Sequence, residues 1–132
     1  MYLPDTNVCI RFLNGKSPMV AKRMAAVRPS QIQLCSVVKA EMLFGAARST
    51  DPERSRATLE GFFSHYHSLP FDDAAAIEYG RIRAHLAALG TPIGPNDLMI
   101  AAIAVSREMV LVTHNTREFA RVPGLLIEDW EL

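Results

Sequence analysis

Short apolar runs alternate with longer amphipathic stretches along the whole chain, and this alternation predicts its strands and helices. The apolar runs predict short strands at residues 1–4, 31–35, 66–70, 110–113 and 125–127. Helical periodicity and capping signals predict helices at residues 6–13, 18–27, 36–48, 51–63, 72–89 and 97–106, and a helical turn at 116–119. Strands that alternate with helices are typical of α/β proteins, so we expect one domain over residues 1–132 with a three-layer α/β/α architecture and a mostly parallel central sheet of four to five strands.

Three acidic residues stand beside apolar segments, where charged side chains are uncommon. Asp5 ends the first apolar run, Glu41 lies within the apolar stretch 37–44, and Asp97 directly precedes the apolar run 98–105. Buried carboxylates are usually paired or bound to a metal. Asp5 is also a favoured helix N-cap, and Asp97 could simply complement a helix N-terminus. The apolar neighbours of Glu41 leave little room for a solvated helix face, which favours a functional role for this residue.

The predicted order of elements brings these acids to one edge of the sheet. Asp5 follows the first strand, whereas Asn115 and Glu118 follow the strand at 110–113. Glu41 lies about one and a half helical turns beyond the strand at 31–35. In parallel sheets, ligands bind outside the carboxyl ends of the strands. Two carboxylates about 4 Å apart repel each other by about 4 kcal/mol at an effective dielectric near 20, so such a cluster predicts a bound cation, for which Mg²⁺ or Mn²⁺ is suited.

The composition of the chain and the motifs that it lacks exclude several classes of function. Lysines and arginines equal aspartates and glutamates in number, at 14 each, so a large basic footprint for nucleic acid is not indicated. The sequence contains no zinc-spaced Cys and His set, no Gly-Lys-Ser or Gly-Lys-Thr phosphate loop and no Gly-x-Ser-x-Gly elbow. It has no signal-peptide pattern and no apolar run long enough for a membrane span, so we expect a cytoplasmic protein with reduced thiols at Cys9 and Cys35.

Five sequence blocks together resemble the PIN-domain ribonucleases, and within them the VapC toxins of type II toxin–antitoxin systems. The blocks are Asp5-Thr6-Asn7, Glu41-Met42-Leu43-Phe44-Gly45-Ala46, the segment from Gly90 through Asp97 to Ala102, Thr113 to Phe119, and Glu128-Asp129-Trp130. Each block alone is a weak signal, but all occur in the same order and cover nearly the whole chain. The resemblance implies a PIN-like fold and a metal-dependent endoribonuclease.

The resemblance also implies roles for individual residues. Asp5 and Asp97 correspond to the main metal ligands, Glu41 supports the site, and Glu118 supplies the fourth acid because the alternative position is Asn115. Pro4 departs from the family pattern and removes a backbone donor directly before Asp5. Side chains expected to orient ligands or water are Thr6, Ser36, Thr113 and Asn115, with Ser36 also expected to cap its helix. Side chains that could contact the RNA backbone, or lie as solvated charges, are Lys39, Arg81, Arg83 and Arg117.

The VapC resemblance further implies a reaction and partners. A bound Mg²⁺ or Mn²⁺ would activate water to attack a phosphodiester of tRNA, with initiator tRNA cut at the anticodon stem-loop. The chain would act as a homodimeric toxin that inhibits translation and is neutralised by a VapB-type antitoxin, with no membrane partner. Two other classes stay open from the residues alone. A receiver-type signalling domain would need a Lys after the strand at 110–113, where Thr113 and His114 stand; a catalytically inactive interaction module would not need the acids.

Overall fold

The computed structural model describes all residues 1–132, and its elements follow the predicted strand and helix order. The five strands are β1 (Tyr2–Pro4), β2 (Gln33–Cys35), β3 (His67–Leu69), β4 (Val110–Val112) and β5 (Leu126–Glu128). The helices are α1 (Thr6–Asn14), α2 (Pro18–Ala26), α3 (Ser36–Ala47), α4 (Pro52–Phe63), α5 (Asp73–Ala88), α6 (Pro95–Ser106) and α7 (Thr116–Phe119). A single 3₁₀ turn, η1 (Pro29–Gln31), was not predicted.

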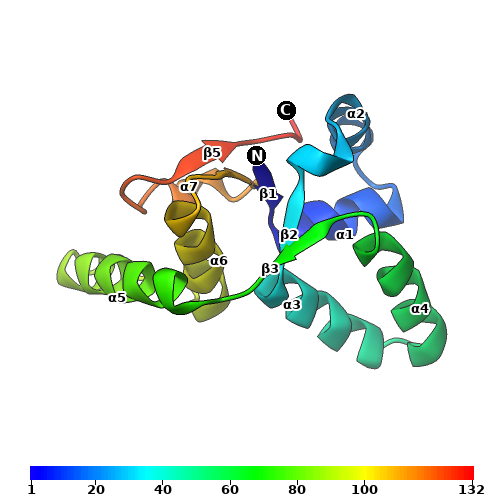
Figure 1. The fold of residues 1–132 in the computed structure, drawn as a ribbon, viewed down its shortest axis with the longest axis horizontal. Helices are drawn as coiled ribbons and strands as arrows, with labels where there is room; N and C mark the ends of the chain where they lie inside the picture. Colours follow the sequence, from blue (N-terminus) through cyan, green and yellow to red (C-terminus); the bar gives the residue numbers. More distant parts are fainter.

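All strand pairs are parallel, which confirms the predicted fold class. Strands β1, β4 and β5 form one ladder in the order β1-β4-β5, and β2 pairs with β3. An isolated parallel bridge between Tyr2 and Ile32 joins the two ladders, which gives the strand order β3-β2-β1-β4-β5. Helices α5 and α6 lie on one side of the strands, and α1, α2 and α4 lie on the other (Figure 1). None of the helices is both long and apolar enough to cross a membrane.

Local chemistry explains where most helices begin. Asp5, Ser17, Asp51 and Asp72 each accept a hydrogen bond from a backbone amide in the first turn of the helix that follows. The expectation that Ser36 caps α3 was wrong. Ser36 is the first helical residue, because Cys35 still has extended backbone angles and occupies the capping position without a side-chain bond.

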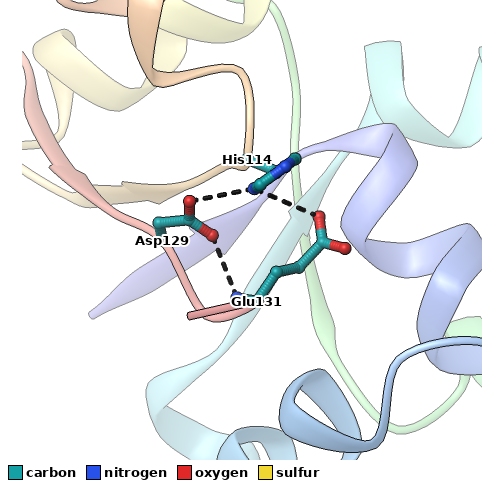
Figure 2. Close-up of side chains that lie close together, drawn as sticks. All are labelled: His114, Asp129 and Glu131. Carbon is teal, nitrogen blue, oxygen red and sulfur yellow. Dashed lines mark hydrogen bonds and ion pairs between the residues drawn. The ribbon is translucent and has the colours of Figure 1, made fainter.

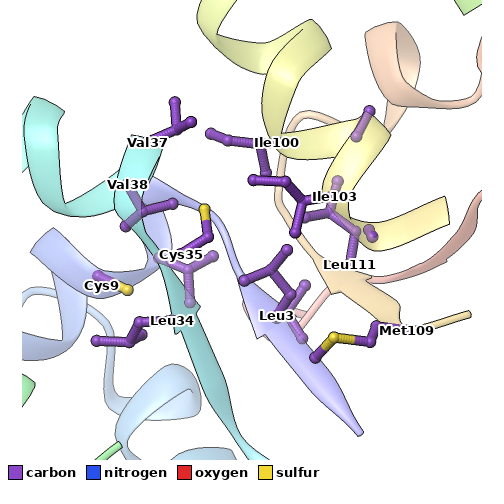
Figure 3. Close-up of a cluster of buried hydrophobic side chains, with 14 of the residues drawn as sticks. Leu3, Cys9, Leu34, Cys35, Val37, Val38, Ile100, Ile103, Met109 and Leu111 are labelled. Atoms are coloured by element: carbon purple, nitrogen blue, oxygen red, sulfur yellow. The ribbon is translucent and has the colours of Figure 1, made fainter. Parts of the chain in front are cut away.

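Three strands share one continuous core with the helices. Leu3 and Leu111 face Ile100 and Ile103 of α6, whereas Leu34 points to the other side of the sheet, toward Cys9 (Figure 3). All five of these aliphatic side chains are almost fully buried. These central strands are buried on both sides, which explains why their sequences read as apolar runs rather than as alternating patterns. The core therefore lies directly beneath the carboxyl ends of β1, β2 and β4.

The two cysteines belong to this core, as predicted. Cys9 and Cys35 are buried free thiols among the apolar side chains (Figure 3). Burial raises the pKa of both thiols, so the reactive thiolate is disfavoured. They serve as packing residues.

Candidate functional site

Asp5 lies at the junction of β1 and α1, where its backbone and its side chain are both hydrogen-bonded. Its side chain is only 6% exposed, and its Oδ1 accepts a hydrogen bond from the Val8 amide at 3.0 Å. The backbone ladder continues past Pro4, because the Asp5 amide donates to the Val112 carbonyl at 2.9 Å. Burial raises the pKa of Asp5, although hydrogen bonding to the Thr113 side chain and the Val8 amide opposes that rise. Asp5 is thus a buried helix cap whose carboxylate also meets the side chain at the end of β4.

Asp97 lies in the first turn of α6. The helix begins at Pro95, two residues before the predicted start, because Pro favours the first helical position and Gly94 takes the cap. Behind Asp97, residues 98 and 100–104 are buried. Burial raises the pKa of Asp97 to about 6, and the charges of Asp5, Glu41 and Glu118 add to that rise. Four carboxylates from four separate parts of the chain therefore influence one another electrostatically.

Glu41 is tied to α1 by a short hydrogen bond. The Thr6 hydroxyl donates to Glu41 Oε1 at 2.5 Å, which fixes the carboxylate of α3 beside the residue that follows Asp5. The expectation that α3 has no solvated face was wrong, because Leu43 is 37% and Phe44 is 62% exposed. Glu41 therefore lies at the border between the core and an exposed apolar helix face.

Glu118 and Asn115, the two candidates for the fourth position of the acidic site, are hydrogen-bonded to each other. The Asn115 amide nitrogen Nδ2 donates to Glu118 Oε2 at 2.7 Å, and the Asn115 backbone amide donates to Thr113 Oγ1 at 3.0 Å. Thr113 is fully buried at the end of β4, so it anchors the turn that carries both residues. The hydrogen bond from Asn115 thus restrains the carboxylate of Glu118.

A groove of about 680 Å³ opens beside these acids. Its lining includes Thr6, Ser36, Glu41, Phe44 and Asn96. Ser36 is exposed toward this groove, in keeping with a role near the site. In this groove the polar side chains of Thr6 and Glu41 lie beside the exposed ring of Phe44 on α3. Such a lining suits an extended ligand that carries both charged groups and flat apolar groups.

The four basic residues considered as RNA contacts are not gathered at the acids. The Lys39 ammonium lies 4.9 Å from the centre of the Phe63 ring, and Arg81 pairs with Glu78 on α5. Arg83 donates to the Tyr79 hydroxyl at 2.9 Å. Arg117 is exposed and makes no ion pair. Of the four, Arg117 alone has a free charge in the turn that carries Glu118.

Sequence reasoning missed an acid that reaches the site from the end of the chain. The charge of Glu131 raises the pKa of Asp5 together with the charge of Glu41. Glu131 also lines a small polar pocket of about 220 Å³ with Asp5, Asn7 and His114. In the sequence, the block Glu128-Asp129-Trp130 indicates only a family resemblance. The sequence does contain a signal for Glu131. In an extended segment alternate side chains point the same way, so Asp129 and Glu131 share one side of the chain, and Glu128 and Trp130 share the other.

Known proteins resemble this chain over nearly its full length. The sequence profile of the PIN domain matches residues 2–125. A tRNA(fMet)-specific endonuclease VapC from Salmonella typhimurium is 45% identical over 129 residues, which cover 98% of this chain and 97% of the relative. The crystal structure of DNA-bound VapBC from Salmonella typhimurium aligns with a TM-score of 0.91 at 44% identity, covering 98% of this chain and 97% of that one. VapBC2 from Rickettsia felis, bound to a DNA fragment from its promoter, aligns with a TM-score of 0.90 at 31% identity, covering 98% of each chain.

Proposed function

Because this chain belongs to the PIN-domain family and is similar to VapC ribonucleases, we propose that it is a metal-dependent endoribonuclease and the toxin of a toxin–antitoxin pair. The observation that carries the proposal is the burial of Asp97 close to other acids: burial raises the pKa of Asp97 to about 6, and the charges of Asp5, Glu41 and Glu118 add to that rise. A relative with 45% identity is named for tRNA(fMet), which supports initiator tRNA as the substrate, cut at the anticodon stem-loop. Such a substrate implies action in the cytoplasm.

The donor set fits a hard divalent cation. Four carboxylates offer oxygen ligands and bring a local excess of negative charge, which Mg²⁺ or Mn²⁺ would neutralise. Asp5 and Asp97 are the proposed metal ligands, and Glu41 and Glu118 complete the catalytic set. When bound, the ion would stabilise charge on the scissile phosphate and lower the pKa of water. No side chain is required as a covalent nucleophile.

The protein's own residues prepare this site. The Thr6 hydroxyl holds Glu41, and Asn115 holds Glu118, so neither carboxylate must lose much side-chain freedom when the site is occupied. Thr113 hydrogen bonding keeps Asp5 ionised more readily than burial alone would allow. The groove beside Glu41 and Phe44 would guide the RNA strand to the acids, with an exposed aromatic ring available for base stacking.

Two protein partners form part of the proposal. The aligned VapBC structures are complexes, which supports a VapB-type antitoxin as the inhibitor of this chain. Exposed Ile77 on α5 and exposed Leu89 at the C-cap of that helix offer apolar surface for a homodimer. The match to the PIN profile excludes the receiver-type alternative. The inactive interaction module is the competing hypothesis, and cleavage measurements distinguish the two.

The deciding experiment measures cleavage of end-labelled initiator and elongator tRNAs with Mg²⁺, with Mn²⁺ and with EDTA. Asp5→Asn and Asp97→Asn should each lower the cleavage rate by at least about 100-fold, since even substitutions of groups that support metal ligands reduce activity about 10- to 100-fold. Asp73→Asn is the matched control, because Asp73 is an exposed aspartate at the start of α5. Cleavage that survives EDTA, or that persists in Asp97→Asn, would contradict the proposed mechanism.

A further inference from the structure

The end of the chain builds a second cluster of metal-ligating side chains that uses none of the four proposed catalytic carboxylates. His114 follows β4, whereas Asp129 and Glu131 follow β5 (Figure 2). His114 Nδ1 lies 2.9 Å from Asp129 Oδ2 and 3.7 Å from Glu131 Oε2, and one ligand atom from each residue lies within 4.8 Å of the others. We propose that His114, Asp129 and Glu131 form a divalent-metal site that fastens the C-terminal segment to the loop after β4.

The spacing of the three side chains is close to that of the ligands around a first-row metal ion. Such ions bind imidazole nitrogen and carboxylate oxygen at about 2.0 to 2.2 Å, so neighbouring ligand atoms lie roughly 3.0 to 3.5 Å apart. The two distances from His114 Nδ1 fall on either side of that range. Both contacts involve the same ring nitrogen, as the dashed lines in Figure 2 show. A mixture of one nitrogen and two oxygens favours Zn²⁺, Mn²⁺ or Co²⁺ over Ca²⁺.

An unsatisfied oxygen points to the missing ligand. Glu131 Oε2 is buried and accepts no hydrogen bond, and it is the one buried side-chain polar atom of this kind in the chain. The side chain of Glu131 is only 12% exposed and that of Asp129 only 9%. Buried polar groups without partners are uncommon, and an ion is one of the few explanations. Arg11 binds the other oxygen, with Nε 3.3 Å from Glu131 Oε1, so Oε2 is left to face His114.

The surrounding structure holds the ligands in place. The Glu131 amide donates to Asp129 Oδ1 at 2.9 Å, and the Thr113 amide donates to the Glu128 carbonyl at 2.9 Å, which keeps the two ligand segments adjacent. Between the two acids, Trp130 is almost fully buried, with its ring centre 5.2 Å from that of Tyr2. Support of this kind is typical of built metal sites.

An entry path exists as well. His114 is 57% exposed and opens onto the polar pocket of about 220 Å³ that also reaches Arg11 and Asn115. Water ligands can occupy this pocket, and the ion can arrive through it. The pocket also touches Asp5, so the second site would lie next to the proposed catalytic site without sharing a ligand.

The test measures the number of bound metal ions in a variant whose proposed catalytic site has lost one of its two metal ligands. Full-length Asp97→Asn, freed of metal with EDTA, is dialysed against Zn²⁺, and the bound ion is counted. We expect one ion per chain, and we expect His114→Gln in that background to weaken binding by about 100-fold or more, since loss of a supporting residue alone weakens sites about 10- to 100-fold. His85→Gln is the matched control, because His85 is an exposed histidine on α5. Asp129→Asn provides a second ligand variant.

A spectroscopic readout locates the ion. Trp130 is the only tryptophan and stands between two of the ligands. Co²⁺ should quench its fluorescence saturably in Asp97→Asn, and this quenching should disappear with His114→Gln. If Asp97→Asn binds no ion, or if His114→Gln binds Zn²⁺ as tightly as its parent, the proposed second site is wrong. Neither outcome depends on RNA cleavage, so the proposed nuclease function is judged separately.

Discussion

Replacing Asp97 with Asn should abolish cleavage and at the same time stabilise the metal-free protein. Burial and three neighbouring carboxylates raise the pKa of Asp97 from 3.8 to about 6. At about 1.36 kcal/mol per pKa unit, ionised Asp97 destabilises the fold by at most about 3 kcal/mol. The helix dipole of α6 favours the charge by up to about 1 kcal/mol, and the side chain is not fully buried, so we expect Asp97→Asn to gain about 1 to 2 kcal/mol.

The sign of the pH dependence follows from the raised pKa. Below the unfolded value of 3.8, Asp97 is protonated in both states and costs nothing. As pH rises toward 6, the folded state holds on to a proton that the unfolded state releases, and stability is lost. The advantage of Asp97→Asn should therefore be complete above about pH 7 and fall to about a third of its full value at pH 4.5.

Urea denaturation in EDTA at pH 7.5 and pH 4.5 measures both the stability gained by Asp97→Asn and the change of that gain with pH, with Asp73→Asn as the control. Adding Mg²⁺ at pH 7.5 should then stabilise the wild type more than Asp97→Asn, because only the wild type retains the full ligand set. A variant no more stable than the wild type at pH 7.5, or a stability gain that does not change with pH, would refute the electrostatic reasoning.

Three further predictions follow from contacts within and beside the site. Thr6→Val should lower kcat of tRNA cleavage about 3- to 10-fold because Glu41 loses its 2.5 Å hydrogen bond, and Thr6→Ser should restore the rate. Thr113→Val should move the acidic limb of the pH–rate profile to higher pH, because the lost hydrogen bond raises the pKa of Asp5 further. Trp130→Ala should destabilise the protein by about 3 to 5 kcal/mol in urea denaturation, since a fully buried indole leaves a large cavity.

Substitutions at exposed positions of the same chain serve as controls for these three predictions. Thr116→Val changes an exposed threonine of α7 and should leave both kcat and the pH profile unchanged. Phe44→Ala changes an exposed aromatic residue and should alter stability by less than about 0.5 kcal/mol. Equal losses in kcat for Thr6→Val and Thr6→Ser would show that Thr6 acts through packing rather than through its hydroxyl.

Most strand and helix positions were predictable because their signals are local. Asp51 with Pro52 starts one helix and Asp72 starts another, and in each case the aspartate accepts a hydrogen bond from an amide three residues later. The prediction starts α6 two residues late, at the charged Asp97, whereas the helix begins at Pro95, whose ring already fixes the required backbone angle. Short-range propensity settles such features before any tertiary contact forms.

Solvent exposure was harder to predict than secondary structure. The apolar run around Glu41 suggested a helix enclosed on all sides, yet Leu43 and Phe44 face solvent beside the groove. An apolar composition indicates that a helix is able to be buried. How much of the helix surface is actually covered depends on how many other helices and strands pack against it. The unpredicted contribution of Glu131 has the same origin, since its approach to Asp5 depends on how the last strand packs.

The strands and helices, the parallel α/β class and the chemical identity of the acids can all be predicted from the sequence. These depend on side-chain periodicity, on caps and on residue type, all of which act over a few positions. Tertiary structure decided which charges share a low-dielectric site: it placed Asp97 among three other carboxylates and brought Glu131 beside Asp5. Electrostatic energy depends on distance and burial, and both are set only when strands distant in the chain become neighbours in one sheet.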